Sequence, residues 1–277
     1  MKKIITALFI TICIGIIGAG NLHAVDITVG ATTWYAWGSR YEKTLNYSIR
    51  KNSNYAFDPA FLYGPVVSIK FSDDFNLTFV YLYSKFNYTE EVYADDGGNL
   101  SVLSKIKRSD SDLAINYRLN DYLKLFVGVK YLGYEINLSY DDIYAGYCYS
   151  KSKHDSLGPG IGLNFTYPAT ENIFLLATLS GFYLWSGGEK FEDNGLYDYK
   201  YPSPMGPVSM TVAYNEYGIN TNISAAYYIT GWSTVISLGI RYQYFITDYA
   251  EYEPFLIDSI KNQFFGITLT ATYSFSL

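Results

Sequence analysis

Cysteine and histidine are nearly absent from this sequence, and their scarcity excludes several kinds of chemistry. Among 277 residues there are two of each. Cys13 and His23 lie in the first two dozen residues, which leaves Cys148 and His154 in the rest of the chain. One cysteine cannot form an intramolecular disulfide, and one cysteine with one histidine cannot build a Cys/His metal site. We therefore expect no cofactor and no metal.

Basic charge is also scarce. The chain has 20 Lys and Arg residues against 26 Asp and Glu residues, and no basic tail, so nucleic acid is not an expected partner. Beyond the N-terminal segment, no run of about 18 apolar residues predicts a transmembrane helix. Aromatic residues, in contrast, make up 19% of the chain, with 31 tyrosines. Such a composition favours β-strands and membrane–water interfaces.

The first 24 residues have the pattern of a secretory signal. Lys2 and Lys3 provide the positive start, an apolar stretch covers residues 4–17, and small residues follow. We expect cleavage after Ala24, with cleavage after Gly20 as the alternative. Residues 1–24 are therefore predicted to be a signal peptide that is removed, and residues 25–277 to be the mature domain.

From residue 26 onward, apolar residues recur with period two, which predicts strands. Each segment has roughly ten to fifteen residues, the length of a tilted strand that crosses a membrane. We expect about ten strands, with eight or twelve left open because the stretch 186–216 could hold a further hairpin. The ten segments are 27–37, 61–71, 75–83, 111–119, 123–133, 157–167, 173–185, 217–229, 232–246 and 265–277.

The predicted connections alternate between short turns and long polar loops. The long ones cover residues 38–60, 84–110, 134–156, 186–216 and 247–264. Short periplasmic turns, long extracellular loops and an even strand number are typical of an antiparallel barrel in the bacterial outer membrane. The fold class is therefore all-β, an up-and-down antiparallel transmembrane barrel.

Within the predicted strands, the charged residues all lie on the face opposite the apolar one. When the lipid-facing parity of each strand is chosen from its apolar residues alone, every charge lies on the opposite, inward face. A lysine or arginine facing lipid at the midplane would cost roughly 2–4 kcal/mol, so this placement is expected of a barrel. The predicted lumen charges are Lys70, Asp112, Arg118, Lys124, Lys130 and Arg241, with Asp112 as the partner of Lys130 or Arg241.

The last segment carries a family resemblance. Residues 269–277 alternate apolar and small polar side chains and end in Tyr273, Phe275 and Leu277. This resembles the closing strand of bacterial outer-membrane barrels, which the barrel-insertion machinery reads. The terminal Leu277 departs from the commoner phenylalanine. The resemblance implies an insertion signal at these three residues, an outer-membrane location and lipid as the surrounding partner.

Toward the long loops, inward positions become apolar and predict either a hydrophobic constriction or a packed plug. Pro65 and Pro159 fall inside predicted strands of a sheet with no free edge, so we expect β-bulges at both. The apolar inward residues are Trp34, Leu82, Leu132, Phe182, Leu184, Phe245 and Phe264.

Two enzymatic readings can be formulated. The omptin proteases are ten-stranded barrels whose active site has two acidic residues facing an Asp–His pair. The residues here that resemble this pattern are Asp110 and Asp112 on one side and His154 and Asp155 on the other. His154 and Asp155 are adjacent, however, so in a strand they point apart. A hydrolase reading would use Ser152, His154 and Ser156, which share a parity but lack a nucleophile-elbow pattern. Solvated loop residues explain both sets more simply, and we expect no enzyme.

Three functions remain from the sequence. The first is a narrow porin-like channel or conduit for small solutes or ligands, biased toward anions by Lys130 and Arg241. The second is a closed structural or adhesive barrel whose extracellular loops bind a surface partner. An outer-membrane protease or lipid hydrolase is the third. The chain is expected to be a monomer, inserted by the barrel machinery.

Overall fold

The computed structural model describes residues 25–44, 53–93, 99–142, 146–187, 189–193, 209–249 and 257–277. The predicted signal segment 1–24 lies outside them, so its cleavage stays a prediction. Within the described residues, no helix is long and apolar enough to cross a membrane.

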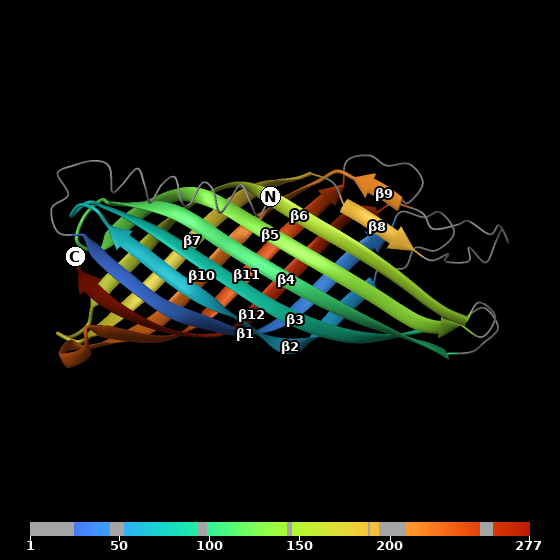
Figure 1. The fold of residues 1–277 in the computed structure, drawn as a ribbon, viewed down its shortest axis with the longest axis horizontal. Coiled ribbons are helices and arrows are strands. Elements are labelled where there is room, and N and C mark those ends of the chain that lie inside the picture. The colour runs from blue at the N-terminus through green and yellow to red at the C-terminus, as the bar shows by residue number, and fades with distance from the viewer. Residues whose placement is uncertain are drawn as a thin grey trace.

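Nearly all of the described chain is antiparallel strand, as the period-two pattern predicts (Figure 1). A 3-10 turn, η1, covers Thr230–Trp232. The strands are β1 Asp26–Thr44, β2 Ser53–Lys70, β3 Phe75–Tyr93, β4 Asn99–Arg118, β5 Leu123–Asp142, β6 Gly146–Pro168, β7 Ile173–Ser186, β8 Glu189–Asp193, β9 Ser209–Val212, β10 Tyr214–Ile229, β11 Thr234–Tyr249 and β12 Ile257–Ser276.

Ten of the described strands close into a barrel. Each pairs with its neighbour in sequence, with β7 pairing to β10, and the pairing of β1 with β12 and of β5 with β6 completes the ring. The short strands β8 and β9 pair with each other, and β8 pairs with residues 150–153 of β6 near its long-loop end. The prediction of a ten-stranded up-and-down barrel is confirmed, and the stretch 186–216 does contain an extra hairpin.

Several strands are much longer than predicted, and four of the five predicted long loops are mostly strand, the exception being 186–216. The stretch 134–156 was expected to be a loop, yet β5 and β6 remain paired as far as Asp142 and Gly146. Beyond the membrane both faces of a strand can be polar, so the hydrophobic alternation disappears while the backbone hydrogen bonds continue. β3 to β6 reach farthest to the right in Figure 1, at the end opposite the short turns.

The bulges predicted at Pro65 and Pro159 are wrong. Pro65 pairs with Ala31 and Pro159 with Val129 without a shift of register. On their other sides, pairing to β3 and β7 skips two residues and resumes in the same register, because proline removes one N–H without adding a residue. A register shift does occur beside a different proline, Pro59, between the pairs Ala36–Ala60 and Gly38–Phe57.

The two faces of the barrel wall differ sharply. The outward residues include many large exposed apolar side chains, among them Phe61, Val127, Ile161, Ile223 and Leu238. A soluble protein rarely exposes so continuous an apolar surface, whereas lipid covers it at no cost. The buried core lies inside the barrel, toward the long-loop end.

Candidate functional site

The seven inward apolar residues predicted from the sequence converge on one layer inside the barrel. Each is at most 7% exposed, and all belong to the same core cluster. Phe264 stacks parallel to Phe245 with ring centroids 6.3 Å apart and meets Trp34 edge-on at the same distance. Phe182 packs against Phe245 from the other side. These rings come from β1, β12, β11 and β7 on one half of the ring of strands, and Tyr134 from β5 meets Phe245 across the lumen with ring centroids 6.2 Å apart.

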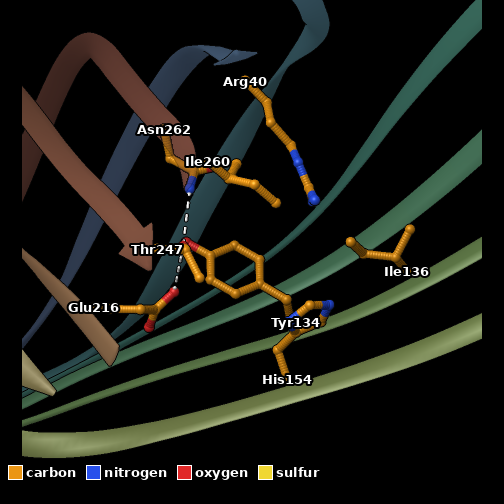
Figure 2. Close-up of a pocket in the computed structure, with 8 residues that line it drawn as sticks. All are labelled: Arg40, Tyr134, Ile136, His154, Glu216, Thr247, Ile260 and Asn262. Carbon is orange, nitrogen blue, oxygen red and sulfur yellow. Dashed lines mark hydrogen bonds between the residues drawn. The ribbon is translucent and has the colours of Figure 1, made fainter. Parts of the chain in front are cut away.

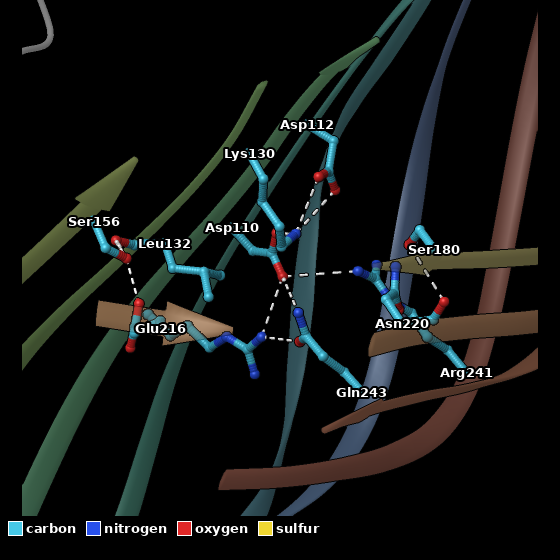
Figure 3. A network of polar contacts seen from close by, with 11 residues as sticks. Asp110, Asp112, Lys130, Leu132, Ser156, Ser180, Glu216, Asn220, Arg241 and Gln243 are labelled. Atoms are coloured by element: carbon cyan, nitrogen blue, oxygen red, sulfur yellow. Dashed lines mark hydrogen bonds and ion pairs between the residues drawn. The ribbon is translucent and has the colours of Figure 1, made fainter. Parts of the chain in front are cut away.

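Asp110 organises a polar network directly beside this layer (Figure 3). Its carboxylate lies 2.5 Å from Lys130 Nζ, 3.1 Å from Arg108 Nη2 and 3.7 Å from Arg241 Nη2. Gln243 Nε2 donates to the same carboxylate at 3.4 Å, and Arg108 in turn donates to the Gln243 side-chain oxygen. Groups on β4, β5 and β11 thus share one buried anion.

The ionic and aromatic parts interleave. Arg108 is fully buried, and its guanidinium carbon lies 4.0 Å from the Phe264 ring centroid. The Arg241 guanidinium carbon is 4.6 Å from the Trp34 ring, and Lys130 Nζ is 5.5 Å from the Phe182 ring. Cations over aromatic faces are attracted by the ring quadrupole, more strongly where water is excluded. We call the four rings Trp34, Phe182, Phe245 and Phe264 together with Arg108, Asp110, Lys130 and Arg241 the interior plug.

The six predicted lumen charges divide into two groups. Lys130, Arg241 and Asp112 come together at the plug, where Asp112 lies 3.1 Å from Lys130 Nζ as its second partner. The other three, Lys70, Arg118 and Lys124, line the exposed rim at the short-turn end.

Two of the rim cations pair with nearby acids, and Lys70 also lies 3.9 Å from Asp26 on the neighbouring strand β1. Lys70 donates to Asp73 at 2.9 Å, and this hydrogen bond and the lysine charge hold the pKa of Asp73 below its usual value. Arg118 pairs with Asp121 in the next turn. Such exposed pairs contribute little to stability because water and salt screen them.

Above the plug lies a small polar cavity (Figure 2). Its volume is about 20 Å³, and a second cavity of about 10 Å³ shares four of its lining residues. A space of this size holds roughly one water molecule and no larger ligand. The lining residues are Arg40, Tyr134, Ile136, His154, Glu216, Thr247, Ile260 and Asn262.

The structure separates the residues of the protease reading. Asp110 and Asp112 point inward, and each accepts a hydrogen bond from Lys130. His154 also points inward, but Asp155 points outward, where it accepts from the Tyr131 hydroxyl and lies 2.7 Å from Lys153. No arrangement of two acids facing an Asp–His pair results among these residues.

The residues of the hydrolase reading are dispersed in a different way. The Ser152 hydroxyl and His154 Nε2 are 3.2 Å apart, while the Ser156 hydroxyl donates to Glu216 instead. Glu216 also accepts from Thr247 at 3.1 Å. Ser152, Ser156, His154 and Glu216 are all buried, so hydrogen bonding inside the wall accounts for them.

Sequence reasoning did not include Arg108, Glu216 and Gln243 among the lumen residues, and it placed Asp110 in the predicted loop 84–110. Arg108 and Asp110 lie in a stretch predicted as loop, although the structure has β4 there. The usable signal was the parity of the fourth predicted strand. Continued backward from Asp112, it puts Asp110, Arg108 and Ile106 on the inward face.

The three residues predicted as an insertion signal lie on the closing strand. Tyr273 and Phe275 stack on the outer wall with ring centroids 6.0 Å apart. The Leu277 N–H donates to the Val25 carbonyl at 3.0 Å, at the seam between β12 and β1. Their role in insertion stays a prediction.

Comparisons with known proteins bear on the fold. No protein-family model and no curated protein sequence matches the chain. Among solved structures, the outer membrane protease OmpT from Escherichia coli is 15% identical with a TM-score of 0.57, over 92% of this chain and 98% of that one. The translocator domain of autotransporter NalP from Neisseria meningitidis is 9% identical with a TM-score of 0.45, over 98% and 95%.

The TM-score of the NalP translocator domain is too low to support any argument. At 15% identity the likeness to OmpT shows the fold alone. Together with the closed ring of ten strands and the apolar outer wall, it defines the class: the chain is a β-barrel of the bacterial outer-membrane type. A function for this chain has to be inferred from the residues of its interior and of its outer wall.

Proposed function

We propose that this protein is a non-conducting outer-membrane barrel that acts at the cell surface by binding a partner there. The interior plug is the observation that supports this best. Trp34, Arg108 and Phe245 are completely buried inside the lumen, and Asp110 is 2% exposed. A ten-stranded barrel lies near the size at which side chains fill the interior. The packed interior therefore favours the closed barrel over the narrow channel.

A solute could cross only by breaking the plug. It would have to part the stacked rings of Phe245 and Phe264 and separate Asp110 from its cations. Exposing a buried ion without its partner costs several kcal/mol. Thermal opening of such a network would be rare, so the plug supports a sealed resting state rather than a selective filter.

The length of the strands supports action at the surface. β4 and β5 have 20 residues each and β6 has 23, whereas a membrane strand needs about 9–11. The surplus lies at the long-loop end and forms a barrel wall that faces water on its outside. A wall of this kind presents a rigid surface to a partner, because its backbone is held by continuous strand pairing.

Reconstitution into planar lipid bilayers tests whether the barrel is closed. The purified full-length protein should give no channel steps, while a double variant, Trp34→Ala with Phe264→Ala, should give measurable conductance because it removes two large rings from the lumen. A porin of known conductance serves as the control for insertion. Stable ohmic steps from the wild type would refute the proposal.

Cell-surface display tests the binding part. Cells displaying the wild type should adhere to at least one coating among glycan arrays and extracellular-matrix proteins. Cells displaying a variant with residues 189–212 replaced by a Gly–Ser linker serve to locate the contact, since β8 and β9 stand on the end of the barrel. Absence of adhesion by the wild type to every coating would remove the adhesive role.

A further inference from the structure

The outer wall of β3 to β6 carries an unusual row of charge just beyond its apolar part. In the strand register, Lys85 lies directly opposite Lys107, Lys107 opposite Glu135, and Glu135 opposite Lys153. All four point outward, since Phe86, Arg108, Tyr134 and His154 next to them point into the barrel. The row therefore runs across four neighbouring strands on one side of the barrel, and it is inclined to the membrane plane because the strands are tilted.

The next outward row continues the same pattern. Lys105 lies opposite Asn87 on one side and Asn137 on the other, and Asn137 lies opposite Lys151. The two rows hold five lysines and one carboxylate, while the whole chain has a formal charge of −6. We call these five lysines, Lys85, Lys105, Lys107, Lys151 and Lys153, the lysine belt.

The register also gives the height of the belt above the lipid. Two outward rows below Lys107 lies the row of Tyr81 and Tyr131, and one further down lies Leu113 with Phe79. Outward rows are about 6.6 Å apart along a strand, or roughly 5 Å along the membrane normal for a strand tilted by about 45°. The aromatic row suits the membrane interface. Measured along β4, Lys107 then lies about 10 Å farther out than this aromatic row, at the level of polar headgroups.

The belt has charge to spare for an external anion. Lys107 Nζ is 2.7 Å from Glu135, and Lys153 Nζ is 2.7 Å from Asp155. No ion pair joins Lys85 or Lys105 to another residue in the described part of the chain. Like charges directly opposite each other on a sheet are destabilising, so the pair Lys85–Lys107 is relieved when an anion bridges it.

We propose that the lysine belt binds the phosphate groups of phosphorylated glycolipids in the outer leaflet. The acyl chains of such a lipid would lie on the apolar rows below, and its phosphates would reach Lys85, Lys105 and Lys107. The belt is continuous with the lipid-facing wall, so a molecule bound to it lies beside the barrel in the membrane. This distinguishes a lipid from a soluble partner and is independent of whether the lumen conducts.

Binding of purified lipid A to the detergent-solubilised full-length protein tests the proposal, with native mass spectrometry as the readout. The wild type should bind bisphosphorylated lipid A and bind the dephosphorylated form at least tenfold more weakly. The triple variant Lys85→Gln, Lys105→Gln, Lys107→Gln should lose about tenfold or more in affinity for the bisphosphorylated form, because each lysine near an anionic lipid surface contributes appreciably.

Lys261 provides the matched control. It is exposed on the outer face of β12, diametrically opposite β5 in the ring, with its Nζ 5.8 Å from the Tyr41 ring centroid. Lys261→Gln should leave the affinity unchanged. Heat-modified mobility in gel electrophoresis checks that each variant has folded.

Three outcomes would overturn the proposal. The first is equal binding of lipid A by the wild type and the triple variant, and the second is equal binding of the two forms of lipid A. The third is inorganic phosphate that binds as tightly as the bisphosphorylated lipid, because the belt would then be a site for a free anion. Raising the salt from about 50 mM to about 500 mM should weaken the binding of bisphosphorylated lipid A to the wild type more than its binding to the triple variant.

Discussion

Asp110 accepts from three neighbouring side chains, Lys130, Arg108 and Gln243, and also lies close to Arg241. The four groups come from β5, β4 and β11, so one carboxylate connects opposite walls of the barrel. A buried ion pair adds little to stability by itself, because desolvation offsets the attraction. Removing Asp110 is different, because the buried Arg108 then loses its carboxylate partner and Lys130 loses one of its two.

The variant Asp110→Asn should therefore be strongly destabilised. It leaves Arg108 and Lys130, both at most 3% exposed, without their main anion, and we expect the free energy of unfolding to fall by roughly 3–5 kcal/mol. Urea unfolding of the protein in phospholipid vesicles, followed by tryptophan fluorescence, measures the change.

Asp73→Asn is the control for this prediction. Asp73 also pairs with a lysine, Lys70, but its side chain is 87% exposed in a turn. The loss of stability should be small, because water and salt screen an exposed ion pair. Equal effects of Asp110→Asn and Asp73→Asn would show that the network around Asp110 is not buried.

At the level of the strands, two Gly–Pro pairs show how the barrel accommodates proline without a free edge. A Cβ on Gly64 would lie 1.9 Å from the Tyr81 carbonyl oxygen, and a Cβ on Gly158 would lie 2.1 Å from that of Tyr183. The backbones of β2 and β3, and of β6 and β7, thus approach too closely for any side chain. Glycine before each proline allows this approach while the register is kept.

Gly158→Ala should accordingly loosen the contact between β6 and β7. We expect a loss of about 1–3 kcal/mol in the free energy of unfolding, as for other overpacked sites. Gly187→Ala is the matched control, because a Cβ at Gly187 meets no atom within 4 Å. Urea unfolding in vesicles measures both, and a Gly158→Ala protein as stable as the control would contradict the close approach.

The same strands show what the sequence could and could not predict. The membrane-crossing part of each strand alternates between lipid and lumen, so residues such as Leu125 and Val127 give a clear pattern. The extension of β4 toward Asn99 carries lysines outside and Arg108 inside, and hydrophobicity does not distinguish its two faces. That loss of contrast is why the strands were predicted too short and the role of Asp110 was missed.

For the interior, the alternation along each strand was sufficient to identify which residues point inward. It could not tell whether their side chains leave a channel or close it. The inward positions of Trp34, Phe245 and Phe264 follow from alternation alone. Whether seven inward apolar residues line a constriction or fill it depends on how their side chains pack across the lumen. That packing depends on tertiary geometry, including the Arg108 side chain between the rings, and no local pattern encodes it.

At the scale of the whole molecule, the account depends on a barrel whose outside meets lipid and whose inside is packed. The four tryptophans report on both surfaces, because they lie in different environments. Trp34 is fully buried in the plug, whereas Trp37 and Trp185 are exposed on the outer wall near the end of the apolar surface. Trp232 is exposed at the short-turn end.

Fluorescence quenching of single-tryptophan variants in vesicles, with the other three tryptophans changed to phenylalanine, is the most direct test. The protein with Trp34 alone should resist both aqueous acrylamide and lipids with brominated chains. Brominated lipids should quench Trp185, and acrylamide should quench Trp232. Strong quenching of Trp34 by acrylamide would mean an open, water-filled lumen, and its quenching by brominated lipid would mean that the inner and outer faces are assigned the wrong way round.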